Sequence, residues 1–303
     1  MAGESASKNI FIPARDLTIA WIDDPQYWKW TSKEIDGKKV EVAELIRVYW
    51  LNIAGSINVQ KLSPGITYEI VFDVLLKESA YDWKNPVNLE LKQPDGLTIV
   101  THESLENQSR DTWFQIKVGE FKVDDVGGKL AFTLYEHGQY WKSGLVVRGV
   151  EILPKKIIIP ARDLAIAWSE DPRYWKWTFK EINGKKVEVA ELIYVWWLDI
   201  RGSIKAEKLS PGITYEILFE LLLKESRYDW KNPVNLKLKW SDGLTIVTNE
   251  SLENKQRDVW FPIKVGEVKV DDGIGELTFT LYDHDGNYVK EGLVVRAAVI
   301  QPK

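Results

Sequence analysis

Residues 68–74, Tyr68-Glu69-Ile70-Val71-Phe72-Asp73-Val74, alternate large apolar side chains with mixed ones. A period of two is typical of a half-buried β-strand, and residues 129–135 show the same pattern. Outward from these runs, turn residues recur at short intervals, as in Ser63-Pro64-Gly65 and Asp95-Gly96. Residues 40–50 alone are ambiguous, and their β-branched content favours a strand over a helix. The closely spaced strands predict an antiparallel β-sandwich.

The chain contains this pattern twice. Residues 13–136 align without a gap with residues 160–283 at an offset of 147, and 93 of the 124 paired positions are identical. One extra residue follows His284. This period is too long for a solenoid repeat and is typical of a whole domain. We therefore expect a disordered tail over residues 1–9 and two sandwich domains over residues 10–154 and 155–303.

The composition excludes several kinds of chemistry. The chain has no cysteine, which excludes disulfides, thiolate catalysis and zinc fingers, and its three histidines are too few for a histidine-rich metal site. The net charge of -5 argues against a dedicated nucleic-acid binder. No run approaches the ~18 apolar residues of a membrane helix, so we expect no membrane insertion. Residues 1–8 lack the pattern of a signal peptide, and we expect a cytoplasmic or nucleocytoplasmic protein without cofactors.

Fifteen tryptophans are the most informative feature of the composition. Trp50 and Trp113 lie in apolar runs and are predicted to fill the core. Residues 21–30 instead mix four aromatic side chains with two acids, a proline and a lysine, which favours an exposed loop. An exposed ring can stack on the C–H face of a pyranose while nearby polar groups bind its hydroxyls, so this loop indicates carbohydrate binding. Six tryptophans recur at equivalent positions: Trp21/Trp168, Trp28/Trp175, Trp30/Trp177, Trp50/Trp197, Trp83/Trp230 and Trp113/Trp260.

Several motifs resemble the phloem protein 2 and tobacco-lectin (Nictaba) family of plants, and the cucurbit phloem lectins in particular. The motifs occupy residues 14–21, 24–28, 41–45, 48–51 and 141–145, in the order typical of that family. The resemblance covers nearly all of both copies. It implies a jelly-roll-like β-sandwich that binds N-acetylglucosamine oligomers (chitooligosaccharides) and the cores of N-glycans. It also implies the phloem sap as an alternative location and a role in plant defence.

The resemblance also implies a set of site residues. Two tryptophans form the family's sugar platform, and two acidic residues seven apart lie near the penultimate strand. The platform falls on Trp21 and Trp28 in the first copy and on Trp168 and Trp175 in the second. The acidic positions fall on Lys129 and Glu136, and on Glu276 and Asp283; the lysine departs from the pattern and could equally lie on a solvated strand edge. The family's downstream tryptophan falls on Trp141, for which the second copy offers Tyr288. Further candidates for extended subsites are Tyr27, Glu44, Tyr174 and Glu191.

Two other functions are weighed against a lectin. Catalysis is disfavoured because Glu136 and Asp283 belong to different copies, and because histidines at strand ends, such as His137 and His284, are usually inert. We therefore expect no enzyme, no catalytic residues and no metal. Relatives in the family are linked to phloem filaments through disulfides, which a chain without cysteine cannot form. RNA binding by stacking on exposed aromatic rings is the remaining alternative, and the acidic net charge works against it.

Overall fold

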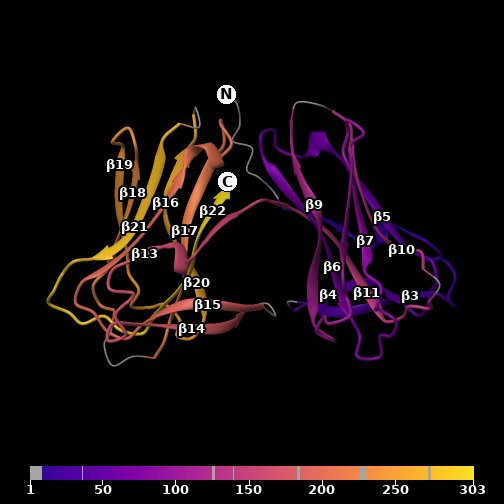
Figure 1. Cartoon of the computed structure of the whole chain (residues 1–303), viewed down its shortest axis with the longest axis horizontal. Coiled ribbons are helices and arrows are strands. Elements are labelled where there is room, and N and C mark those ends of the chain that lie inside the picture. Colours follow the sequence, from indigo (N-terminus) through magenta and orange to yellow (C-terminus); the bar gives the residue numbers. More distant parts are fainter. Residues whose placement is uncertain are drawn as a thin grey trace. The chain divides into compact units, whose positions relative to one another are not determined.

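The computed structural model describes residues 9–35, 37–124, 127–138, 140–182, 185–225, 230–271 and 274–303. The chain divides into two units, Met1–Lys155 (unit 1) and Lys156–Lys303 (unit 2). Most of the expected N-terminal tail, residues 1–8, lies outside the described residues. Each unit contains the same succession of strands and short 3-10 turns (Figure 1).

Unit 1 is built from two antiparallel sheets. The larger sheet has the strand order β3-β4-β11-β6-β9, with β1 also paired to β11, and the smaller has the order β2-β5-β10-β7-β8. The elements of unit 1 are β1 (Ile10–Pro13), η1 (Ala14–Asp16), β2 (Thr18–Ile19), β3 (Trp28–Ile35), β4 (Lys38–Leu45), β5 (Leu51–Asn58), η2 (Val59–Lys61), β6 (Thr67–Leu76), β7 (Val87–Lys92), β8 (Thr98–Glu103), β9 (Trp113–Lys122), β10 (Lys129–Glu136) and β11 (Leu145–Pro154).

Unit 2 repeats this topology. Its sheets have the orders β14-β15-β22-β17-β20, with β12 paired to β22, and β13-β16-β21-β18-β19. The elements of unit 2 are β12 (Ile157–Pro160), η3 (Ala161–Asp163), β13 (Ala165–Ile166), β14 (Trp175–Ile182), β15 (Lys185–Leu192), β16 (Leu198–Lys205), η4 (Ala206–Lys208), β17 (Thr214–Leu223), β18 (Val234–Trp240), β19 (Thr245–Glu250), β20 (Trp260–Lys269), β21 (Glu276–Asp283) and β22 (Leu293–Pro302).

The core of each unit lies between its two sheets. The runs at 68–74 and 129–135 lie in β6 and β10, and they bring Phe72 and Phe132 together with ring centres 6.0 Å apart. Gly55 in β5 allows this packing, because a Cβ there would stand 2.4 Å from the Phe132 ring. In unit 2 the buried apolar cluster draws all its members from residues 161–300. The prediction of tandem antiparallel β-sandwiches is confirmed.

Trp113 occupies a different place from the one predicted. It is half-buried on the outer face of the larger sheet, where it packs against a small cluster of Val42, Leu75 and Val146. Trp260 does the same in unit 2. Both rings therefore cover the sheet from outside and do not fill the core between the sheets.

Four loops meet at one end of each sandwich. In unit 1 they are residues 20–27, 46–50, 77–86 and 137–144. The backbone N–H of Ile46 donates to Tyr27 O at 2.8 Å, Val48 pairs with Lys142, and Trp83 Nε1 donates to Ser143 O at 2.9 Å. These bonds hold together segments that are far apart in the sequence, and the predicted site residues Trp21, Tyr27 and Trp141 lie on them.

Candidate functional site

Trp21 and Trp168 are held outward by an unusual backbone conformation. Their φ angles are 66° and 65°, in the left-handed region that bulky side chains rarely adopt. The two residues are also among the most exposed large apolar residues of the described part of the chain, at 59% and 61%. Strain of this kind persists only where the surrounding structure imposes it, and it concentrates at functional sites.

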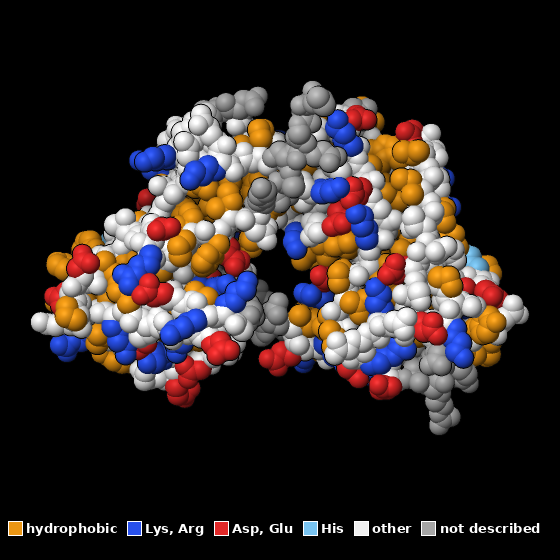
Figure 2. All heavy atoms as spheres, turned by 180° about the vertical axis from the view of Figure 1, so that it is seen from behind, with side chains coloured by type: hydrophobic (Ala, Val, Ile, Leu, Met, Phe, Trp, Pro, Cys, Tyr) orange, Lys and Arg blue, Asp and Glu red, His pale blue; other side chains and the backbone are white. Residues whose placement is uncertain are grey.

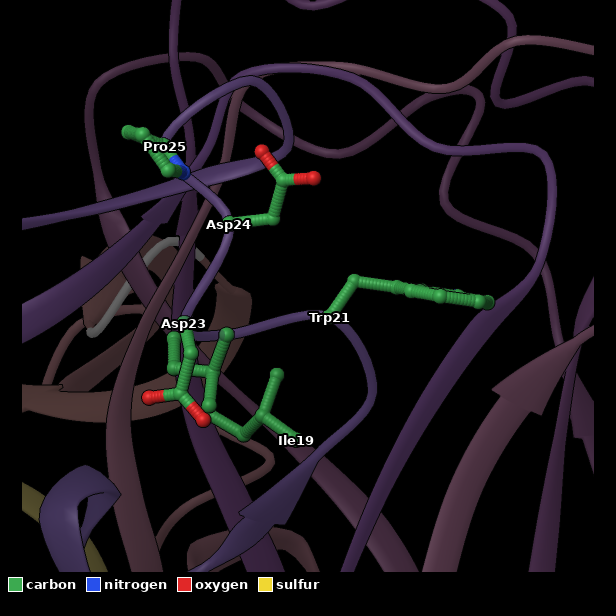
Figure 3. A pocket seen from close by; sticks show the side chains of 6 residues that line it. Ile19, Trp21, Asp23, Asp24 and Pro25 are labelled. Atoms are coloured by element: carbon green, nitrogen blue, oxygen red, sulfur yellow. The ribbon is translucent and has the colours of Figure 1, made fainter.

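A shallow hollow of about 480 Å³ lies beside Trp21, and its other lining residues are Ile19, Ile22, Asp23, Asp24 and Pro25. Figure 3 shows the Asp24 carboxylate pointing toward the same space as the Trp21 ring, whereas Asp23 points away from it. A local hydrogen bond stabilises the loop, because Asp24 Oδ1 accepts the backbone N–H of Gln26 at 2.9 Å. An apolar ring and a carboxylate therefore face one open space.

In unit 2, four aromatic side chains form a continuous row. Ring centres are 6.1 Å apart for Trp168 and Tyr174, 5.6 Å for Tyr174 and Tyr194, and 5.8 Å for Tyr194 and Trp196. The loop between β13 and β14 and the loop between β15 and β16 supply these rings. We refer to these four residues as the unit 2 row.

Unit 1 has a row of different composition. Trp21 and Tyr27 have ring centres 5.9 Å apart, and Tyr49 and Trp141 have ring centres 3.9 Å apart. Arg47 joins the two pairs: its backbone N–H donates to Tyr27 O, and its guanidinium lies 5.3 Å from the Trp141 ring centre. We refer to these five residues as the unit 1 row.

Trp28 and Trp175 are not exposed, and the sequence prediction on this point is wrong. Each is 1% exposed at the start of its strand, and its indole N–H donates to a backbone carbonyl, Ala20 O or Ala167 O, at 3.0 Å. A fully packed ring presents no face on which a sugar can stack. These two tryptophans instead anchor, from inside, the loop that carries Trp21 or Trp168.

Trp50 was predicted to fill the core, and this prediction is wrong. Trp50 and its counterpart Trp197 are both 52% exposed. Trp50 stacks on His137 with ring centres 3.8 Å apart, and Trp197 stacks on His284 at 4.0 Å. Burial lowers the pKa of His137. The Trp50–His137 and Trp197–His284 stacks each add a partly exposed aromatic surface at this end of their unit.

Glu136 and Asp283 are buried, and each forms an ion pair with a buried lysine, Lys142 or Lys290. Lys142 Nζ also donates to Tyr49 O at 2.8 Å and to Tyr140 O at 3.0 Å, and burial lowers its pKa. The pair therefore holds two of the loops that carry the unit 1 row. That Glu136 and Asp283 also accept hydrogen bonds from a sugar stays a prediction.

Lys129 and Glu276 do not share a site with these carboxylates. Lys129 begins β10 and Glu136 ends it, and Glu276 and Asp283 have the same relation in β21. Seven residues of strand at ~3.3 Å each separate them by about 23 Å. Both Lys129 and Glu276 are exposed, which agrees with the alternative of a solvated strand edge.

Tyr288 is not the counterpart of Trp141. The bridges Val48–Lys142 and Val195–Lys290 align the two final loops, so Val289 precedes Lys290 as Trp141 precedes Lys142. Tyr288 matches Tyr140 and, together with Asp283 and Trp230, lines a small cavity of about 40 Å³. The unit 2 row thus lacks a ring at the Trp141 position.

Glu44 and Glu191 lie on a sheet and outside the aromatic rows. Glu44 pairs with Lys77 at 2.7 Å and with Lys29 at 3.1 Å, and Glu191 pairs in the same way with Lys224 and Lys176. Burial alone would raise the pKa of Glu44, but hydrogen bonds from the two lysines outweigh burial and hold this pKa below its ordinary value. A hollow of about 270 Å³ lies beside Glu191. That Glu44 and Glu191 belong to extended subsites stays a prediction.

Sequence reasoning missed Arg47, Tyr49, Tyr194 and Trp196. A signal was present, because Arg47/Tyr194 and Tyr49/Trp196 differ between copies that otherwise match closely around them. Within the residues that the structure describes, no group of three or more His, Asp or Glu side chains could hold a metal ion. No helix among them has the length and apolar character needed to cross a membrane.

Comparison with known proteins gives consistent matches. The family model for Phloem protein 2 matches residues 7–154 and again residues 155–302. A lectin of Luffa acutangula is 44% identical over 156 residues, which are 50% of this chain and 74% of that protein. Protein PHLOEM PROTEIN 2-LIKE A1 of Arabidopsis thaliana is 40% identical over 158 residues, 50% of this chain and 64% of that protein. A lectin of Coccinia grandis is 32% identical over 141 residues, 46% of this chain and 90% of that protein.

Among solved structures, the tandem CBM22-1-CBM22-2 domain of Paenibacillus barcinonensis Xyn10C covers 99% of this chain and 99% of its own, at 12% identity and a TM-score of 0.33. The C-terminal CBM6 of LamC from Zobellia galactanivorans covers 49% of this chain and all of its own, at 16% identity and a TM-score of 0.28.

Proposed function

Since this chain belongs to the phloem protein 2 family, we propose that it is a non-enzymatic lectin that binds N-acetylglucosamine oligomers and N-glycan cores. Two of the relatives described above carry the name lectin. Each unit has its own aromatic row, so the proposal assigns one sugar site to each unit.

The observation that carries the proposal is the row of exposed and partly buried rings that begins at Trp21 or Trp168. Neighbouring rings lie 5.6 to 6.1 Å apart in unit 2, and the row extends over four side chains. A sugar unit of an oligomer can stack on an open ring face of the row, because each pyranose presents an apolar C–H face. The carboxylate of Asp24, which shares the hollow with Trp21, can accept hydrogen bonds from hydroxyl or N-acetyl N–H groups.

The decisive experiment is a calorimetric titration with chitotriose. The wild-type chain is expected to bind about two trisaccharides, and the double variant Trp21→Ala, Trp168→Ala none. Each ring that acts as a binding hot spot contributes on the order of 1–3 kcal/mol. Phe179→Ala is the matched control, because Phe179 is 58% exposed but lies on β14, outside the unit 2 row. Absence of binding to the wild-type chain at millimolar chitotriose would overturn the proposal.

RNA binding is the other outcome that this titration can reveal. On the face shown in Figure 2, basic and acidic side chains are interspersed, which suits phosphate backbones poorly. RNA that binds with a steep dependence on salt, and that chitotriose displaces, would favour this function over the lectin.

We place this activity in the cytoplasm, the nucleus or the phloem sap of a plant cell, in defence against chitin-bearing organisms. The relatives named above come from plants. A fluorescent fusion expressed in plant tissue tests the location, and accumulation in the secretory pathway would contradict it.

A further inference from the structure

The two rows differ by a coordinated pair of residues. Arg47 of unit 1 corresponds to Tyr194 of unit 2, and Trp141, over which Arg47 lies, corresponds to Val289. The cation and the ring that supports it are therefore present together in one unit and absent together from the other. At the same position, unit 2 continues its row of neutral rings through Tyr194.

The guanidinium of Arg47 is available to a ligand. Arg47 is exposed, and within the described residues its guanidinium forms no ion pair but lies over the face of Trp141. A guanidinium that lies over a ring on one face keeps its N–H edges open, and those edges match the two oxygens of a carboxylate or a sulfate.

Unit 2 also has an arginine near its row, but an acid already neutralises it. Arg173 lies 5.3 Å from the Tyr174 ring centre and donates to both oxygens of Asp171, with Nη2 to Oδ2 at 2.6 Å and Nε to Oδ1 at 3.0 Å. These hydrogen bonds raise the pKa of Arg173 further. Unit 1 has Gln26 at the corresponding position, and its row carries Arg47, which has no acidic partner among the described residues.

We propose that unit 1 prefers acidic glycans, in which a sugar on the row carries a carboxylate or sulfate that Arg47 binds, whereas unit 2 prefers neutral ones. This inference rests on the proposed lectin function. It also orients the ligand, because the Asp24 carboxylate faces the hollow at the Trp21 end of the row and repels an anion there. The acidic sugar therefore lies at the Arg47 end.

The test compares chitotriose with two derivatives that carry a 6-carboxylate or a 6-sulfate on one terminal sugar. In the Trp168→Ala background, which leaves the unit 1 row intact, an acidic derivative is expected to bind about tenfold more tightly than chitotriose at low salt. Adding Arg47→Tyr should remove this preference, and raising the salt concentration should weaken it. Lys129→Ala is the matched control, since it removes one positive charge of unit 1 about 23 Å from Glu136 along β10.

A reciprocal exchange completes the design. In the Trp21→Ala background, the neutral sugar should bind unit 2 at least as tightly as the derivatives, and adding Tyr194→Arg with Val289→Trp should create a preference for the acidic ones. Preference for only one derivative identifies which anion the site accepts. Binding of chitotriose without any acidic preference in unit 1, or a preference that survives Arg47→Tyr, overturns this inference and leaves the lectin intact. Failure of the wild-type chain to bind any of the three sugars overturns the lectin itself.

Discussion

At the scale of single residues, the backbone of Trp21 and Trp168 distinguishes them from the tryptophans that pack in the core. A left-handed φ for a bulky residue costs on the order of 1–3 kcal/mol, and an exposed ring recovers little of this through burial. Trp28 shows the opposite arrangement, with an ordinary strand conformation and a fully buried ring. The first arrangement supports the proposed binding role of Trp21, and the second is that of a packing residue.

We predict that Trp21→Gly leaves the free energy of unfolding unchanged or raises it by up to about 1 kcal/mol, because glycine adopts a positive φ without strain. The same variant should weaken sugar binding to unit 1. Urea unfolding and chitotriose titration measure the two effects. Trp28→Ala, the comparison variant, should cost about 3–5 kcal/mol through the cavity that it leaves. A large loss of stability in Trp21→Gly would show that Trp21 is a packing residue.

The buried carboxylates Glu44 and Glu191 give the stability a defined pH dependence. Their lysine partners lower both folded-state pKa values against the opposing effect of burial. A carboxyl whose pKa is lowered on folding stabilises the protein above its unfolded value, here near 4.5, and this stability disappears as the pH falls through the folded value.

We therefore predict that the double variant Glu44→Gln, Glu191→Gln is less stable than wild type at pH 7, by an amount on the order of 1 kcal/mol. At pH 3 the difference should shrink, because the wild-type carboxyls then become protonated. Denaturant unfolding at the two pH values checks this. A difference that stays constant between pH 7 and pH 3 would show that the ion pairs contribute nothing through titration.

At the scale of elements, the β10–β11 loop depends on an ion pair that forms where β10 ends. Lys142 and Glu136 are both buried, and Lys142 ties its own loop to the β4–β5 loop through Tyr49 O. Lys290 makes the corresponding bond to Trp196 O at 2.7 Å in unit 2. One buried pair thus fixes, in each unit, two of the loops at the site end of the sandwich.

We predict that Lys142→Met destabilises the protein by about 3–5 kcal/mol, because the Glu136 carboxylate is then buried without a partner. Adding Glu136→Gln removes the charge and should restore much of the stability. The double variant should still bind sugar more weakly at unit 1, because the two loops are no longer tied together. Normal affinity in the refolded double variant would refute the positioning role of Lys142.

At the scale of the whole molecule, two complete sandwiches share one chain. The core cluster of unit 2 includes Trp175, Phe219 and Phe279 and contains no residue of unit 1. A unit with its own core can unfold without the other, and the simple two-state description then fails for the full chain.

We predict that Phe279→Ala lowers the stability of unit 2 by about 3–5 kcal/mol and splits thermal unfolding into two transitions. Calorimetry of the full chain measures this. The upper transition should keep the wild-type midpoint, and chitotriose should raise it through the intact site of unit 1. A single transition that shifts as a whole would show that the two units unfold together.

Much of the fold could be predicted from the sequence, because it depends on local patterns. The period of two in residues 68–74 and 129–135 predicted β6 and β10, and the internal repeat predicted that the second half has the same architecture. A strand over residues 129–136 also implies that Lys129 and Glu136 lie about 23 Å apart, since this is the length of seven residues of extended chain. This distance alone shows that Lys129 and Glu136 do not bind the same sugar unit, and it needs no tertiary information.

The tertiary structure alone decided which tryptophans face solvent. Trp28 is buried with its indole N–H satisfied by Ala20 O, and Trp50 is exposed on the β4–β5 loop with its ring stacked on His137. Neither partner lies within the local sequence pattern that suggested an exposed loop for Trp28 and a core strand for Trp50. The sequence by itself determined the family, the strands and the duplication, whereas the membership of each aromatic row depends on contacts between loops that only the folded chain brings together.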